Sequence, residues 1–148
     1  MSYTTDIEGS VSINPPLPWS QIKDSPILPA NAKAAGYWPD AYLHVIETEV
    51  DTDDGILTRR VADAIVASEY ETCGRTLIND VQALIDANPD HEFTGMFECE
   101  GERRDDLWRL VVRGRRAVKV TARIVWPDGD AAQWAALLSP RARTSPAC

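Results

Sequence analysis

The sequence predicts an α+β fold, in which a mostly antiparallel sheet of about six strands carries one main helix on one face. Two observations lead to this expectation. Apolar and polar residues alternate in several separate segments, which is the period of strands with one buried face. A single segment, residues 73–88, has the helical period instead. The resulting order is strand, long loop, two strands, helix and three strands, which suits a helix packed on one side of a sheet.

The first predicted strand spans residues 6–14, where Ile7, Val11 and Ile13 share one parity. A proline-rich segment, residues 14–41, follows and contains six of the ten prolines of the chain. Proline lacks the N–H group that sheets and helix interiors require, so we expect an irregular loop with at most a short helical turn. A loop of this length is typically functional or pinned by its own side chains.

Two further strands and the helix follow the loop. Residues 42–50 form the second predicted strand, and residues 56–66 form the third. The parity of the second strand is shared by Tyr42, His44, Ile46 and Val50. In the third strand the apolar parity changes part-way, which a β-bulge would reconcile. The helix presents one apolar face, made of Leu77, Ile78, Val81, Leu84 and Ile85, and we expect Asn88-Pro89 to end it.

The last three predicted strands span residues 93–99, 106–112 and 117–126. In the final strand we expect one parity to face the core, namely Val118, Val120, Ala122, Ile124 and Trp126. A tight turn is predicted at Arg113-Gly114. Residues 131–148 are expected to form a short helical turn and a flexible tail, so a single domain is predicted over residues 1–130.

Composition and charge narrow the classes of function. The net charge of -8 disfavours a chain that coats nucleic acid or an anionic membrane. No segment approaches the ~18 apolar residues of a membrane helix, and the first ten residues do not resemble a signal peptide. The three cysteines are odd in number, widely spaced and without a CxxC motif. We therefore expect a cytoplasmic protein without a disulfide framework or a zinc site.

The most acidic stretch, "EVDTDDGILTRR" from Glu49 to Arg60, is predicted to be a hairpin tip. An EF-hand loop needs oxygen ligands at positions 1, 3 and 5, glycine at 6 and glutamate at 12, and neither possible register meets this pattern. A looser calcium site built by a turn is the alternative. Asp54-Gly55 suits a turn that needs a positive φ angle. The candidate partner-binding residues are Glu49, Asp51, Asp53 and Asp54.

Basic residues in the last strands suggest a second candidate surface. Arg109, Lys119 and Arg123 take the parity opposite the apolar residues, so we expect them on the sheet face away from the helix. They could bind an anionic small molecule, a nucleotide or an acidic partner. The structural alternative is that they pair with carboxylates across neighbouring strands. Nucleic acid is not expected, because the aromatic residues take the inward parity.

No catalytic residue, metal ligand or cofactor is predicted. The chain lacks the GxSxG, GxGxxG and HExxH motifs and any phosphate-binding glycine loop. An enzyme of unrecognised type would have to use Glu102, Asp105 or Cys73, and nothing in the sequence favours that assignment.

Several short motifs carry a resemblance. The segments "PPLPW" (15–19), "HEFTG" (91–95), "LWR" (107–109) and "VWP" (125–127) are similar to those of small uncharacterised proteins from actinobacteria and their phages. The similarity covers most of residues 6–130. It implies a domain of unknown function in a setting of mobile elements, with no catalytic residues to carry over.

Three functions remain open from the sequence. The first is a small acidic protein-binding module, such as a phage-related inhibitor or regulator. The second is a binder of an anionic small molecule or nucleotide on the basic sheet face. The third is an enzyme of unrecognised type. The expected partner is another protein, and no membrane association is expected.

Overall fold

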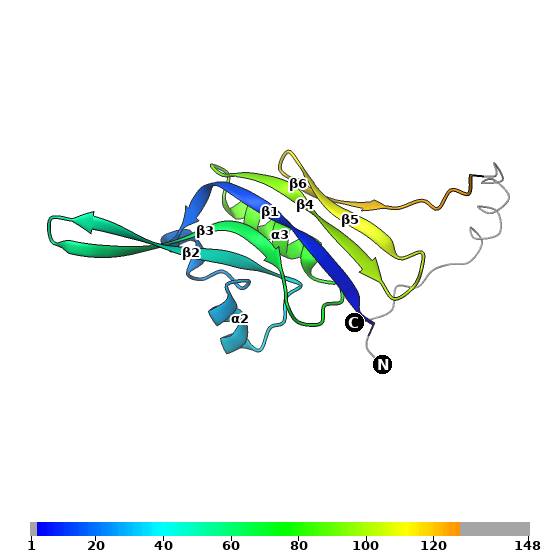
Figure 1. Ribbon diagram of the computed structural model, residues 1–148, viewed down its shortest axis with the longest axis horizontal. Coiled ribbons are helices and arrows are strands. Elements are labelled where there is room, and N and C mark those ends of the chain that lie inside the picture. The colour runs from blue at the N-terminus through cyan, green and yellow to red at the C-terminus, as the bar shows by residue number, and fades with distance from the viewer. Residues whose placement is uncertain (1–2, 128–148) are drawn as a thin grey trace.

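The computed structural model describes residues 3–127, in which six strands form one antiparallel sheet. The strands are β1 (Thr5–Pro18), β2 (Ala41–Thr52), β3 (Gly55–Ala67), β4 (Glu92–Gly101), β5 (Leu107–Arg113) and β6 (Arg116–Thr121). The helices are α1 (Trp19–Ile22), α2 (Pro29–Ala35) and α3 (Leu77–Ala87). The order across the sheet is β2-β3-β1-β4-β5-β6, and α3 lies across one face (Figure 1). The predicted α+β class is confirmed.

The predicted helical turn and tail at 131–148 lie outside the described residues. None of the helices within residues 3–127 combines the length and the apolarity that crossing a membrane would require.

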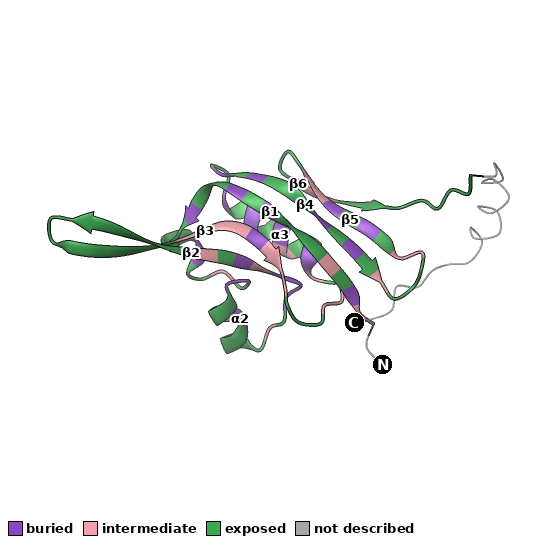
Figure 2. Ribbon diagram, in the orientation of Figure 1, coloured by how far each residue is buried: buried purple, intermediate pink, exposed green. Residues whose placement is uncertain are grey.

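The core lies between α3 and the sheet face that it covers. α3 buries Leu77, Val81, Leu84 and Ile85, which belong to the face predicted from the helical period. The sheet contributes buried side chains from five strands, among them Val11, Ile13, Leu43, Ile65, Phe93, Phe97, Cys99, Trp108 and Leu110. Figure 2 shows buried residues recurring along the strands within this part of the sheet. Each fully buried aliphatic or aromatic side chain contributes about 1.5–3 kcal/mol.

Two glycines let β1 and β4 lie close together. Gly9 (φ 111°) and Gly95 (φ 136°) both have positive φ angles inside strands. A Cβ atom at Gly9 would collide with the carbonyl oxygen of Met96, and one at Gly95 would collide with that of Ser10. Only glycine therefore fits these two positions without moving the backbone of the neighbouring strand.

The proline-rich segment is more ordered than the sequence predicts. β1 continues to Pro18, and the rest of the segment contains α1 and α2 instead of one irregular loop. The Asn31 side-chain amide donates to the carbonyl oxygens of Lys23 and Ser25 at 2.7 and 2.9 Å. Ile22, Ile27, Leu28 and Ala32 are buried, so apolar side chains do pin the segment.

The strand parities differ from the prediction in two places. In β2 it is Leu43 that faces the core, because it pairs with buried Ile65, whereas Tyr42 and His44 lie on the other face. β6 ends at Thr121, earlier than expected, and Val120 pairs with exposed Arg109. Opposite residues in an antiparallel pair share a face, so the expectation that Val118 and Val120 face the core is wrong.

The predicted bulge in β3 is confirmed. The pairing of β2 with β3 shifts between His44 and Val45, which pair with Ala64 and Ala62 and leave Asp63 as the extra residue. The Asp63 carboxylate lies 2.8 Å from Nδ1 of His44. The bulge explains why the apolar parity of the sequence changes within this strand.

Candidate functional site

The β2–β3 hairpin extends beyond the rest of the sheet as a two-stranded arm, defined here as Glu47–Arg60 (Figure 1). β3 pairs with β1 only from Val61 onward, so the arm has β2 and β3 alone. Every residue of the arm is exposed, and Figure 2 shows the arm in the exposed colour throughout. The arm is therefore built from local strand pairing, without a share of the core.

The tip of the arm is the hairpin turn that the acidic stretch predicts. Thr52 pairs with Gly55 across the two-residue loop of Asp53 and Asp54. Gly55 has a φ angle of 125°, and the Thr52 hydroxyl donates to its carbonyl oxygen at 2.7 Å. Glycine at this position gives the chain the positive φ angle that the turn needs.

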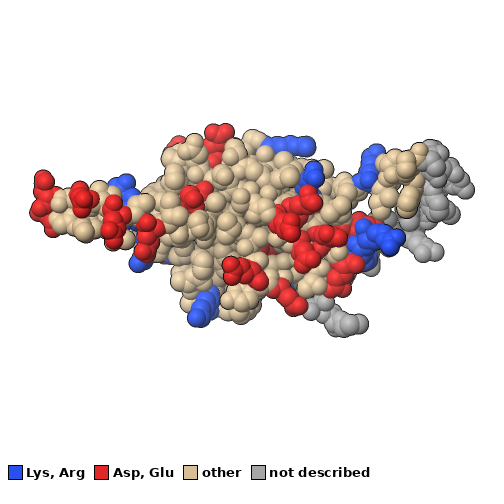
Figure 3. All heavy atoms as spheres, in the orientation of Figure 1, with Lys and Arg blue, Asp and Glu red and all other residues tan. Residues whose placement is uncertain are grey.

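The four predicted partner-binding carboxylates gather on the outer half of the arm. Glu49 and Asp51 share one face of the ribbon, and Asp53 and Asp54 occupy the turn. Figure 3 shows acidic side chains spaced along the arm out to its end. Within residues 3–127, none of the four has a hydrogen-bond or ion-pair partner. The tip is thus an exposed concentration of negative charge.

Apolar side chains accompany these charges. Val50 and Leu57 pair directly on one face of the arm and are 40% and 56% exposed. Ile56 lies on the opposite face and is 67% exposed. The arm therefore offers both negative charge and uncovered aliphatic surface.

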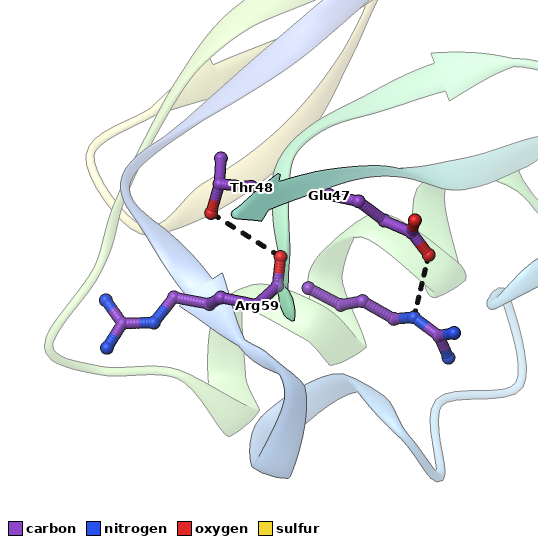
Figure 4. A network of polar contacts seen from close by, with 4 residues as sticks. Glu47, Thr48 and Arg59 are labelled. Carbon is purple, nitrogen blue, oxygen red and sulfur yellow. Dashed lines mark hydrogen bonds and ion pairs between the residues drawn. The ribbon is translucent and has the colours of Figure 1, made fainter. Parts of the chain in front are cut away.

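The base of the arm is held by charged and aromatic contacts. The Glu47 carboxylate accepts a hydrogen bond from Nε of Arg60 at 2.9 Å, and the Arg60 guanidinium lies 5.4 Å from the ring centroid of Trp19. Beside this pair, the Thr48 hydroxyl contacts the carbonyl oxygen of Arg59 at 3.5 Å (Figure 4). The Arg59 guanidinium extends away from both contacts in the same view.

A groove of about 1100 Å³ lies at this base. One wall is formed by the end of β1 and the start of α1, at Pro15, Pro16, Pro18 and Trp19. The other is formed by Ile46 of β2, which precedes the arm, and by Leu57, Arg59 and Arg60 of the arm. The prolines and Trp19 make it mainly apolar. The groove and the arm form one continuous exposed surface.

The predicted basic face does not exist as one surface. Arg109 lies on the face away from α3, where Nη2 is 3.1 Å from the Glu98 carboxylate on the neighbouring strand. Lys119 pairs with buried Leu110, so it lies on the opposite face, with its ammonium 4.6 Å from the Trp108 ring centroid. Arg123 lies beyond the end of β6. The prediction that the three basic residues share a face is wrong. It assumed that the apolar residues of the last strand face the core, whereas Val120 pairs with exposed Arg109.

Two of the residues named for an unrecognised enzyme, Glu102 and Cys73, are held in specific contacts. Two hydrogen bonds from Thr4 lower the pKa of the exposed Glu102 carboxylate. Cys73 is disulfide-bonded, which removes it as a free thiolate and differs from the expectation drawn from cysteine spacing. Within the described part of the chain, no three metal-ligating side chains converge on a possible ion position.

Two charged side chains that the sequence does not single out hold the ends of α3. The buried Asp40 carboxylate accepts hydrogen bonds from the N–H groups of Cys73, Gly74, Thr76 and Leu77 at 2.8–3.3 Å. At the other end, the Arg115 guanidinium donates to the carbonyl oxygens of Ile85, Asn88 and His91. Both charges complement the helix dipole. Neither could be found from local sequence, because each acts on a distant segment.

The chain belongs to the family of unknown function DUF6205, whose model matches residues 1–135. It matches no curated protein and no solved structure.

Proposed function

Because its family has no assigned activity, we propose from the structure that this chain is a protein-binding module and that the arm is its contact element. The exposure of the arm carries the proposal. A two-stranded ribbon without a core is marginally stable in water. Uncovered aliphatic surface, such as that of Val50, Ile56 and Leu57, is typical of interaction sites. A partner that covers the arm would bury this surface.

The charge of the tip indicates the chemistry of that partner. Four carboxylates without partners within residues 3–127 suit a surface rich in lysine and arginine. Charges of this kind mainly accelerate association and select the orientation, whereas the aliphatic residues beside them supply affinity. The resemblance to proteins of actinobacteria and their phages supports a regulator or inhibitor that acts by occupying a basic surface of a host protein.

The proposal is tested by capturing partners on the tagged chain from an actinobacterial lysate. The test variant carries Asp51→Asn, Asp53→Asn and Asp54→Asn. The matched control carries Asp24→Asn, Asp90→Asn and Glu92→Gln, which remove the same number of exposed carboxylates from the body. This control separates the effect of the tip from that of net charge.

The expected result is one or more proteins that the wild type and the control retain and that the tip variant loses. Retention should weaken as salt rises toward about 0.5 M, because exposed charges are screened there. Equal retention by all three chains would exclude the tip as the contact surface.

A further inference from the structure

A second exposed site lies apart from the arm, in a cleft of about 550 Å³ between α2 and the edge of the sheet at β2. The walls of this aromatic cleft include three of the four tyrosines of the chain and one of its tryptophans: Tyr37, Tyr42, Tyr70 and Trp38. A cavity of this volume is within the range of small-molecule sites.

Two of these rings are exposed and touch each other. Trp38 is 70% exposed and Tyr70 is 67% exposed. Their ring centroids are 5.8 Å apart, and their planes meet at 79°. Large aromatic side chains are normally half-buried or better, so core packing does not explain these two. Rings at nearly a right angle form a corner with aromatic surface on two sides.

The topology of the hairpin brings the two rings together. Ala41 at the start of β2 pairs with Ala67 at the end of β3. One residue further out, the N–H of Ser68 donates to the carbonyl oxygen of Asp40 at 3.0 Å. Trp38 precedes this closed end and Tyr70 follows it, so the two segments leave the sheet side by side. Tyr42 lines the same cleft, where burial raises its pKa and the charge of Tyr70 raises it further.

The charged residues of the cleft include one carboxylate without a partner. Glu69 has no hydrogen bond or ion pair within residues 3–127. His44, on the same wall, is engaged with Asp63 at 2.8 Å. Lys33 of α2 is exposed, so its ammonium can stay in water while its stem lines the cleft.

We propose that the aromatic cleft binds a methylated or quaternary ammonium group, with the faces of Trp38 and Tyr70 against the cation and Glu69 as its counter-charge. Ring faces carry negative potential, and a methylated ammonium is large and weakly hydrated, so aromatic corners recognise this group. The site is independent of the function proposed for the arm.

A proline-rich segment is the competing occupant, since such segments dock in aromatic-lined grooves. The near-perpendicular rings and the unpaired Glu69 favour a compact cation over an extended peptide.

Choline and its neutral isostere 3,3-dimethylbutan-1-ol test the proposal, because the two differ in charge and hardly in shape. Both are titrated at constant ionic strength while the indole N–H signal of Trp38 is followed by NMR. The signal is identified from its loss in Trp38→Phe. Choline should bind about tenfold more tightly than the alcohol if a cation–π contact is made.

Four variants refine the test. Tyr70→Ala should weaken choline binding about tenfold, whereas Trp19→Ala, which alters an exposed tryptophan elsewhere, should leave it unchanged. Glu69→Gln should weaken binding and Lys33→Gln should strengthen it, each by about threefold, because each removes one charge near the cation. Circular dichroism confirms that each variant remains folded.

Three results would overturn the proposal. Equal binding of choline and the alcohol would identify an apolar pocket, and tighter binding of a proline-rich peptide would identify a peptide groove. No change at Trp38 up to about 50 mM choline would show that the cleft has no useful affinity for the cation.

Discussion

Replacing Asp40 by asparagine tests how α3 is attached to the sheet. The carboxylate is 2% exposed, and its two oxygens accept four backbone hydrogen bonds at the start of the helix. Thr76 is the N-cap residue of α3, but its side chain makes no capping hydrogen bond to the helix. The distant Asp40 carboxylate therefore takes the place of the usual N-cap side chain. In asparagine an NH₂ group would replace one carboxylate oxygen and face backbone N–H groups. Both groups are donors, so those N–H groups would lose their acceptor.

The magnitude follows from the two shorter bonds, from Thr76 N at 2.8 Å and Leu77 N at 3.1 Å. A hydrogen bond to a charged group contributes about 1.5 kcal/mol or more, so these two bonds account for about 3 kcal/mol. The longer bonds from Cys73 and Gly74 add less, and relief of the desolvation of the carboxylate offsets part of the loss.

We expect Asp40→Asn to lower the free energy of unfolding by about 3 kcal/mol, measured by urea denaturation with far-UV circular dichroism. Asp24→Asn, which changes an exposed carboxylate, is the control and should alter stability by less than about 0.5 kcal/mol. A loss below about 1 kcal/mol for Asp40→Asn would show that the helix end does not depend on this carboxylate.

Three further predictions concern the body of the protein. Arg115→Lys should lower the free energy of unfolding by about 1–2 kcal/mol, since an ammonium cannot reproduce the fork of hydrogen bonds to the end of α3; an unchanged urea midpoint would contradict this. Gly9→Ala should cost about 2–4 kcal/mol because its Cβ atom meets the carbonyl oxygen of Met96, and a melting temperature equal to wild type would exclude the clash. Burial raises the pKa of the Cys99 thiol from 9.0 to about 12. Between these two values the thiol ionises in the unfolded chain but stays protonated in the folded protein. The free energy of unfolding should therefore fall as the pH rises from 9 toward 12. Cys99→Val should lack that part of the fall, and an identical pH profile in both chains would remove the thiol as its cause.

The periodicity of the sequence predicts most of the sheet and the helix, because burial of one face leaves a direct record in alternating or helical patterns. It fails in β6, where Val118 and Val120 lie on the uncovered face and Lys119 lies over Trp108. An apolar residue is not evidence of burial when its strand lies at the edge of a sheet and one face of that sheet is uncovered. The register between β5 and β6, which the turn between Arg113 and Arg116 fixes, decides which side chains of β6 face the core.

The candidate sites depend in part on contacts between segments that are far apart in the sequence. The acidic tip could be recognised from its composition and turn chemistry. That the hairpin outgrows the sheet depends on where the pairing of β3 with β1 ends, at Val61, and no local pattern records this. The meeting of Trp38 with Tyr70, and of Asp40 with α3, likewise depends on contacts between distant segments.

The central claim is that the arm serves binding and contributes nothing essential to the fold. It is tested most directly by replacing residues 49–58 with Asn-Gly, which joins Thr48 to Arg59, partners in the present ladder, through a two-residue hairpin turn. The shortened chain lacks all four tip carboxylates and retains the contacts of Glu47 and Arg60. We predict an unfolding transition within about 0.5 kcal/mol of wild type and complete loss of the captured partner. An unfolded shortened chain, or one that still retains the partner, would contradict the account.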